Sequence, residues 1–200
     1  MLGRACLVTV SYFVILVAVG VACSSSSSDK TTSWVMQGAS MEPTFSNGTP
    51  LTAHSYDHSV QIGDIIVFRA PLSVNSDSIK RVIAGPGQTV VVDGPNHAVA
   101  VDGIRINESY TEGNTECFLS GPGTCKFAVP PTESGVASIP GDGSSPVDPT
   151  ARDEACRRSG CYFVMGDNRQ NSSDSRAGWL VPTDNIIGHV DSPGTRPPKA

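Results

Sequence analysis

Short apolar runs, each bounded by glycine, proline or other turn residues, recur along most of the chain. The runs are rich in valine, isoleucine and aromatic residues, and each is shorter than a typical helix. Buried β-strands have this length and composition, and turn residues mark their ends. The pattern therefore predicts a mostly β domain with strands at residues 51–53, 65–68, 79–84, 88–92, 162–165 and 186–190.

Residues 97–107 carry a more specific pattern, that of a β-hairpin. Asp102 and Gly103 form a dipeptide that suits a two-residue type I′ turn, in which both residues have positive φ. With this dipeptide as the loop, Val101 faces Ile104 on the apolar side of the ladder. We therefore expect antiparallel pairing here, with one face half-buried.

The N-terminal pattern differs from the rest, because residues 5–22 contain no charged side chain. At 1.5 Å per residue, a helix of this length just crosses a bilayer core of about 30 Å, and it exceeds the usual apolar core of a cleaved signal peptide. We therefore expect a transmembrane helix that anchors the chain through residues 1–23. Two alternatives stay open: small residues before Ala22 suit cleavage, and Cys23 suits lipid attachment.

The remaining segments define a simple domain organisation. Residues 24–33 are serine-rich and too polar to form a core, so we expect a tether. An extracytoplasmic domain is expected over residues 34–192, followed by a disordered tail at 193–200. Within the domain, residues 108–160 lack sustained periodicity and contain several proline-rich turns, which predicts a peripheral, loop-rich insertion.

Composition and charge narrow the class of protein further. The chain has 20 glycines and 15 prolines but few aromatic residues, which favours strands and turns over a helical bundle. Its net charge is -5, and no long run of lysine and arginine is present. A nucleic-acid partner is therefore not expected.

Four cysteines follow the expected membrane span, as two sequence-local pairs: Cys117 with Cys125, and Cys156 with Cys161. An even number of cysteines beyond a span suggests disulfides in an oxidising compartment. Zinc binding is disfavoured, because neither pair has the C-x2-C spacing and no histidine stands near. We expect neither a metal nor a cofactor.

Residues 37–45 place one hydroxyl, that of Ser40, on a short and conformationally restricted stretch. Gly38 permits unusual backbone angles, and Pro43 fixes its own φ and disfavours helix before it. This favours a stiff turn that aims the hydroxyl. A neutral serine is a poor nucleophile, so catalysis by Ser40 requires a base elsewhere in the chain.

Lys80 is the candidate base, because it interrupts the valine- and isoleucine-rich run at 79–84. An alternating strand side chain at this position points either to the core or to water. A lysine with an ordinary pKa of about 10.4 is protonated near pH 7, whereas burial lowers that pKa by up to about 3 to 5 units. A buried Lys80 is therefore expected to supply a neutral amine.

Together, residues 38–44, 63–68, 80–87 and 166–176 resemble, in order and content, the motifs of type I signal peptidase. That family comprises membrane-bound Ser-Lys endopeptidases. The resemblance covers most of residues 37–190 apart from the insertion. It implies a mostly antiparallel β-sheet catalytic domain facing the outer leaflet, with Ser40 as nucleophile and Lys80 as general base.

The resemblance also implies roles for residues of the last motif. Ser172 would hydrogen-bond the lysine amine, and Asp174 and Arg176 would form a supporting ion pair. One departure concerns Gly38, which stands where Gram-negative members carry a hydroxyl residue. The Ser40 backbone N–H would then stabilise the oxyanion with a water or another amide.

The implied substrates are exported preproteins, cleaved after small residues with alanine one and three positions before the scissile bond. The implied location is the bacterial cell membrane, with a monomeric enzyme in contact with membrane lipid. A substrate bound as an extended strand would place alternate side chains in shallow pockets. We expect apolar walls formed by Met41, Pro43, Ile65, Val67 and Ile83.

Two other functions remain compatible with these residues. A LexA-like autoprotease of the repressor type uses the same Ser-Lys chemistry, but the expected membrane span argues against it. A catalytically inactive, anchored β domain would bind envelope proteins without cleaving them. A Ser-His-Asp site is disfavoured, because the histidines are scattered.

Overall fold

The computed structural model describes residues 30–56, 60–70, 76–118, 123–132 and 149–191. The expected anchor at residues 1–23, most of the tether and the tail at 193–200 lie outside these ranges. Within the described ranges, no helix is both long and apolar enough to cross a bilayer.

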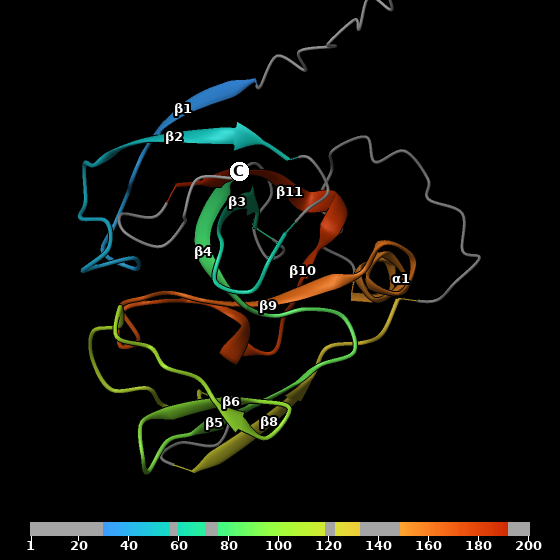
Figure 1. The fold of residues 1–200 in the computed structure, drawn as a ribbon. Helices are drawn as coiled ribbons and strands as arrows, with labels where there is room; N and C mark the ends of the chain where they lie inside the picture. The colour runs from blue at the N-terminus through green and yellow to red at the C-terminus, as the bar shows by residue number, and fades with distance from the viewer. Residues whose placement is uncertain (1–29, 57–59, 71–75, 119–122, 133–148, 192–200) are drawn as a thin grey trace, which may run out of the picture.

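The larger of two sheets contains seven antiparallel strands and positions the site (Figure 1). Each strand predicted in this part of the chain is present, and its ends lie within two residues of the predicted ones. From one edge to the other, the order is β1 (Thr31–Val35), β2 (Pro50–Ser55), β11 (Ile186–Val190), β3 (Ile65–Arg69), β4 (Asp77–Ala84), β9 (Cys161–Met165) and β10 (Val181–Pro182).

The smaller sheet has the order β7 (Ile104–Arg105), β6 (Ala98–Val101), β5 (Thr89–Asp93) and β8 (Thr124–Ala128). The predicted hairpin is confirmed: Val101 pairs with Ile104, and the two loop residues, Asp102 and Gly103, have φ of 51° and 80°. Outside the sheets lie helix α1 (Pro149–Ser159) and two 3-10 turns, η1 (Ser175–Ala177) and η2 (Thr183–Asn185).

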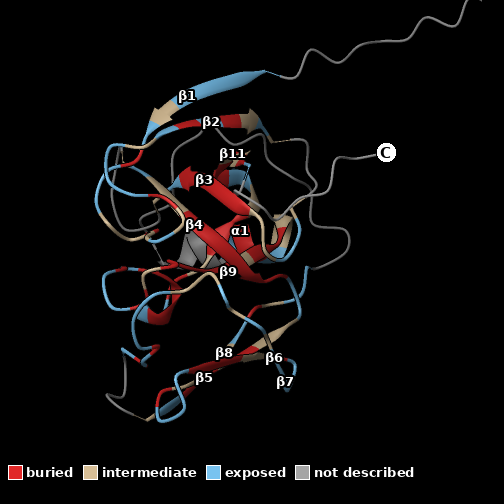
Figure 2. Ribbon diagram, turned by 60° about the vertical axis from the view of Figure 1, so that its left-hand side comes forward, coloured by how far each residue is buried: buried red, intermediate tan, exposed pale blue. Residues whose placement is uncertain are grey.

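Strand β3 forms the centre of the core, since the side chains on both of its faces are buried (Figure 2). Ile65 and Val67 pack with residues of β2 and of the turn after β1, whereas Ile66 and Phe68 pack against the cluster that contains Trp179. This alternation follows from the two-residue period of a strand. Strand β4 pairs with β3 on one side and with β9 on the other, and it is therefore held in the interior.

The structure differs from the prediction in three segments, one of which is the two-residue strand β10, paired with β9. Strand β1 begins at Thr31, inside the expected tether, because the edge of β2 supplies backbone partners to a stretch with little apolar content. The expected loop-rich insertion contains β8, which pairs with β5, and helix α1. Both elements depend on partners distant in sequence, so local periodicity does not reveal them.

The two sequence-local cysteine pairs lie close enough to bond. Cys117 and Cys125 have Cα atoms 5.8 Å apart, and Cys156 and Cys161 have Cα atoms 4.8 Å apart. Both separations suit a disulfide. The first pair links the segment after β7 to β8, and the second links α1 to the start of β9.

We predict that these two pairs are oxidised in the mature protein, without crossed pairing. Each closes a short loop, so each contributes at most about 3 kcal/mol in the chain-entropy model. Peptide mapping under non-reducing conditions tests the connectivity. Free thiols at these positions, or a peptide that joins Cys125 to Cys156, would contradict it.

Candidate active site

Ser40 lies on a tight turn that leaves the end of β1 and is fixed at both ends. Gly38 has φ of +82°, and its N–H donates to the Asn47 side chain at 2.9 Å. Next to Ser40, the Met41 side chain is fully buried in the core, and its carbonyl accepts a hydrogen bond from the Phe45 N–H at 2.8 Å. The turn therefore presents the serine hydroxyl from a backbone with little freedom.

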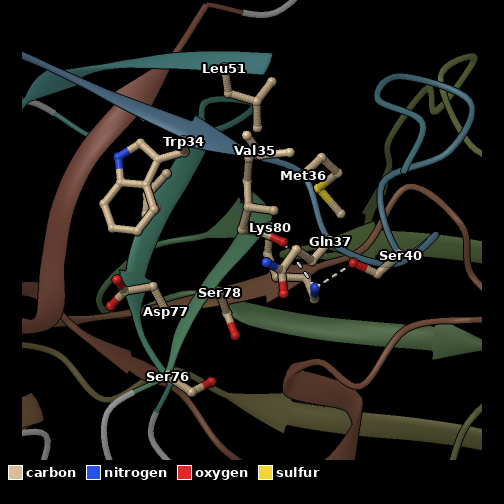
Figure 3. A pocket seen from close by; sticks show the side chains of 12 residues that line it. Trp34, Val35, Met36, Gln37, Ser40, Leu51, Ser76, Asp77, Ser78 and Lys80 are labelled. Atoms are coloured by element: carbon tan, nitrogen blue, oxygen red, sulfur yellow. Dashed lines mark hydrogen bonds between the residues drawn. The ribbon is translucent and has the colours of Figure 1, made fainter. Parts of the chain in front are cut away.

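Lys80 reaches the same point from β4, where it pairs with Ile66 of the central strand. Only 5% of Lys80 is exposed. Its Nζ lies 2.8 Å from Ser40 Oγ and donates to the Ile79 carbonyl at 2.9 Å (Figure 3). The structure thus brings together the two residues that the sequence marks as nucleophile and base.

Burial changes the proton affinity of this amine. Desolvation lowers the pKa of Lys80 from 10.5 to about 8, because the charged form loses its hydration, while the carboxylates of Asp174 and Asp167 oppose this shift. A substantial neutral fraction is therefore present in mildly alkaline solution, which a surface lysine lacks.

Each carboxylate that acts on Lys80 is itself held by a buried arginine. Asp167 accepts two hydrogen bonds from Arg81, at 2.9 and 2.6 Å. Asp174 accepts two from Arg176, at 2.8 and 2.9 Å. These paired geometries are the strong form of a charge-assisted hydrogen bond. They offset the negative charge near Lys80, which otherwise favours its protonated form.

The chain after β9 is hydrogen-bonded directly to the turn that carries Ser40. The Asn168 N–H donates to the Ser40 carbonyl at 3.1 Å. A Cβ at Gly166 would lie 2.4 Å from that carbonyl oxygen and 2.3 Å from Ser172 Oγ. Only glycine fits here without a shift, so the close approach of these two segments depends on Gly166.

Ser172 differs from its expected arrangement. It is buried beside Gly166, but its Oγ has no hydrogen-bond partner among the described residues, so the expected bond to Lys80 is not formed. The lysine amine is instead directed to Ser40 and to the Ile79 carbonyl.

A cleft of about 420 Å³ opens beside the Ser40–Lys80 contact. Of the five side chains expected to line it, only Val67 does so. Met41 and Ile65 are core residues, Ile83 packs in the cluster shared with β5 and β6, and Pro43 is exposed on the turn. The expectation was wrong for these four, because apolar character alone does not reveal which way a strand or turn side chain faces.

The actual lining comes from two segments that flank Ser40 and Lys80 in the sequence, together with Leu51 and Val67. Figure 3 shows Gln37 near Ser40 and Asp77 farther along the cleft. Most of these lining residues lie close to Ser40 or Lys80 in the chain, and this closeness is the sign in the sequence that could have identified them. The further lining residues are Trp34, Val35, Met36, Gln37, Leu51, Ser76, Asp77, Ser78 and Ile79.

The family model and the relatives that match this chain carry the same description, that of a signal peptidase. A protein-family model described as "Signal peptidase, peptidase S26" matches residues 7–194. Signal peptidase I of Bacillus caldolyticus is 32% identical over 161 residues, which cover 79% of this chain and 76% of the relative. Signal peptidase IB of Staphylococcus aureus is 30% identical over 162 residues, covering 80% of this chain and 75% of the relative.

Two further matches carry similar descriptions. Probable signal peptidase I-1 of Synechocystis sp. is 36% identical over 161 residues, covering 76% of this chain and 64% of the relative. A crystal structure of a signal peptidase I from Enterococcus faecalis aligns with a TM-score of 0.41 and 23% identity, covering 66% of this chain and 97% of that one. Because the family model matches well over half of the chain, the protein belongs to the signal peptidase family, peptidase S26, and is a peptidase of that family.

Proposed function

We propose that this protein is a membrane-anchored serine endopeptidase that removes signal peptides from exported preproteins through a Ser40–Lys80 dyad. The observation that carries the proposal is the 2.8 Å contact between Ser40 Oγ and the buried Lys80 amine. Family membership supports the same reaction class.

In the first half of the proposed reaction, the neutral Lys80 amine takes the proton of the Ser40 hydroxyl while Oγ attacks the scissile carbonyl carbon. The short contact allows this transfer without an intervening water. The carbonyl electron pair moves to oxygen and forms a tetrahedral oxyanion. Its collapse breaks the C–N bond, and the Lys80 ammonium returns the proton to the leaving amine. The signal peptide remains as an ester on Ser40.

In the second half, water hydrolyses the ester. Lys80 again accepts a proton as the water attacks, and it returns that proton to Ser40 Oγ when the second tetrahedral intermediate collapses. One base therefore serves both halves. Ser172, buried and unpaired in this structure, is proposed to accept a hydrogen bond from the amine and to orient its lone pair.

The backbone N–H of Ser40 is proposed as an oxyanion donor. Gly38 has no side chain to contribute, and its N–H is already engaged with Asn47. A fixed amide on a rigid turn costs little reorganisation when charge develops on the carbonyl oxygen. A water or another amide would supply the second donor.

The proposed substrate binds as an extended strand in the cleft, between the residues after β1 and those at the start of β4. Met36, Val67 and Ile79 give this cleft apolar walls. Main-chain hydrogen bonds would provide affinity, and shallow pockets would admit only small side chains near the scissile bond.

The proposed topology places the uncharged stretch at residues 1–23 in the bacterial cell membrane as a single-pass anchor. A tether leads to the peptidase domain on the extracytoplasmic side, where a monomer would act beside the membrane lipid. The expected disulfides are consistent with an oxidising space outside the cytoplasm.

Replacing either member of the dyad should abolish cleavage without unfolding the domain. We expect Ser40→Ala and Lys80→Met each to lower kcat by at least about a thousandfold, because one removes the attacking oxygen and the other its proton acceptor. Turnover of a fluorogenic precursor peptide by detergent-solubilised protein measures this. Lys126→Met, at an exposed lysine on β8, is the matched control. A folded variant with near-wild-type turnover would exclude the dyad.

The rate should rise with pH as the base loses its proton. Because only the neutral amine accepts a proton and the pKa of Lys80 is about 8, kcat/KM should increase about tenfold per pH unit below 8 and level off above it. A pH series with a precursor peptide tests the sign and the midpoint. A profile that is flat from acidic to alkaline pH would refute this assignment of the base.

The cleft should select small residues directly before the scissile bond. A peptide series that varies this position should show a loss of about a hundredfold from alanine to leucine, because a displacement of the carbonyl by about 1 Å has that effect on rate. Equal kcat/KM for the alanine and leucine peptides would rule out a shallow pocket. Alanine three positions before the bond should be preferred for the same reason.

A further inference from the structure

Residues 108–118 belong to none of the sequence motifs, yet they lie along the segment that follows β9. The Glu112 N–H donates to the Asp167 carbonyl at 2.9 Å, and the Glu112 carbonyl accepts from the Arg169 N–H at 2.8 Å. Glu112 and Asn168 form an isolated parallel bridge. The segment expected to be peripheral is therefore hydrogen-bonded to the backbone that carries Asp167.

Aromatic and backbone groups of this segment cover the arginines that hold the two carboxylates near Lys80. The Tyr110 ring centre lies 4.0 Å from the guanidinium carbon of Arg81. The Phe118 ring centre lies 4.1 Å from that of Arg176, which also donates to the Glu116 carbonyl at 3.3 Å. Rings stacked on guanidinium groups exclude water and hold the plane of the charge.

A third buried arginine, Arg169, contacts Arg176 and the residue before Asp167. Arg169 forms an ion pair with Glu108 and donates to Thr115 Oγ1 at 3.0 Å. Its Nε donates to the Gly166 carbonyl at 3.0 Å, and its own carbonyl accepts from Arg176 at 2.8 Å. Segment 108–118 thus contacts every arginine of the network.

The charges that act on Lys80 make this cover relevant to its proton affinity. Asp167 and Asp174 face Lys80 with Arg81 and Arg176 as their partners, and Asp77 lies in the same cleft. If water entered under the segment, Arg81 and Arg176 would neutralise the charges of Asp167 and Asp174 less completely. Water would also hydrate the ammonium form of Lys80. Both effects favour the protonated amine, so they raise the Lys80 pKa together.

We propose that segment 108–118, joined to β8 through Cys117 and Cys125, is a positioning element that keeps the environment of Lys80 dry and its neighbouring carboxylates tightly paired. This rests on the proposed function of Lys80 as the base. Tyr110 is its central positioning residue, because its ring packs on the arginine that follows Lys80 in β4.

The test compares kcat/KM against pH for the full chain in detergent. In the double variant Cys117→Ser/Cys125→Ser, the rising limb of the plot of kcat/KM against pH should shift to higher pH by about one unit. Below the midpoint, kcat/KM then falls about tenfold, whereas the alkaline plateau is retained. Tyr110→Leu should move the limb in the same direction, and Tyr110→Phe, which keeps the ring over Arg81, should restore it. Thermal unfolding of each variant is measured in parallel.

The matched control is Cys156→Ser/Cys161→Ser, which removes the pair between α1 and β9. This variant should lose thermal stability without moving the limb. The wild type should show the rising limb. If neither Tyr110→Leu nor the Cys117/Cys125 variant shifts that limb, the inference is wrong, while the proposed role of Lys80 as the base is unaffected. If kcat/KM of the wild type does not rise near pH 8, the proposed role of Lys80 is wrong, and this inference is wrong as well.

Discussion

The removal of one lysine amine from water is the constraint on which the rest of the site depends. A fall in the pKa of Lys80 from 10.5 to about 8 corresponds to roughly 3 kcal/mol, which the fold must supply by holding the side chain inside. Strand β4 does so by placing Lys80 beside the central strand β3. The buried pairs Arg81–Asp167 and Arg176–Asp174 keep charged groups close by while leaving little uncompensated negative charge.

The second requirement is fixed geometry between segments far apart in the chain. The turn that carries Ser40 follows β1, Lys80 and Arg81 lie on β4, and the segment with Asp167, Arg169, Asp174 and Arg176 follows β9. Backbone contacts join them: the Ser40 carbonyl accepts from Asn168, and Gly166 leaves room for that approach. A misplacement of about 1 Å costs about a hundredfold in rate, so such contacts matter as much as the reactive groups.

Features that depend on local sequence patterns could be predicted, whereas features that depend on contacts between distant segments could not. Valine-rich runs identified the strands, and the Asp102-Gly103 turn fixed the hairpin register. Ser40 and Lys80 were chosen as candidates from the sequence, and the structure places Oγ and Nζ of these residues 2.8 Å apart. Strands β1, β8 and β10 were not predicted, because each depends on a partner strand distant in sequence. The cleft walls depend on which face each side chain takes, and the Glu108–Arg169 contact spans 61 positions, so local patterns give no sign of either.

Burial should make the Lys80 amine lose its proton far below the ordinary lysine pKa, and direct titration of that amine is the sharpest test. In full-length protein with lysine labelled at Cε, NMR signals can be followed against pH, with the Lys80 signal assigned by its loss in Lys80→Met. A midpoint near 8 is expected for Lys80. A Lys80 signal with its midpoint at the ordinary lysine value of about 10.4 would show that burial does not lower this pKa.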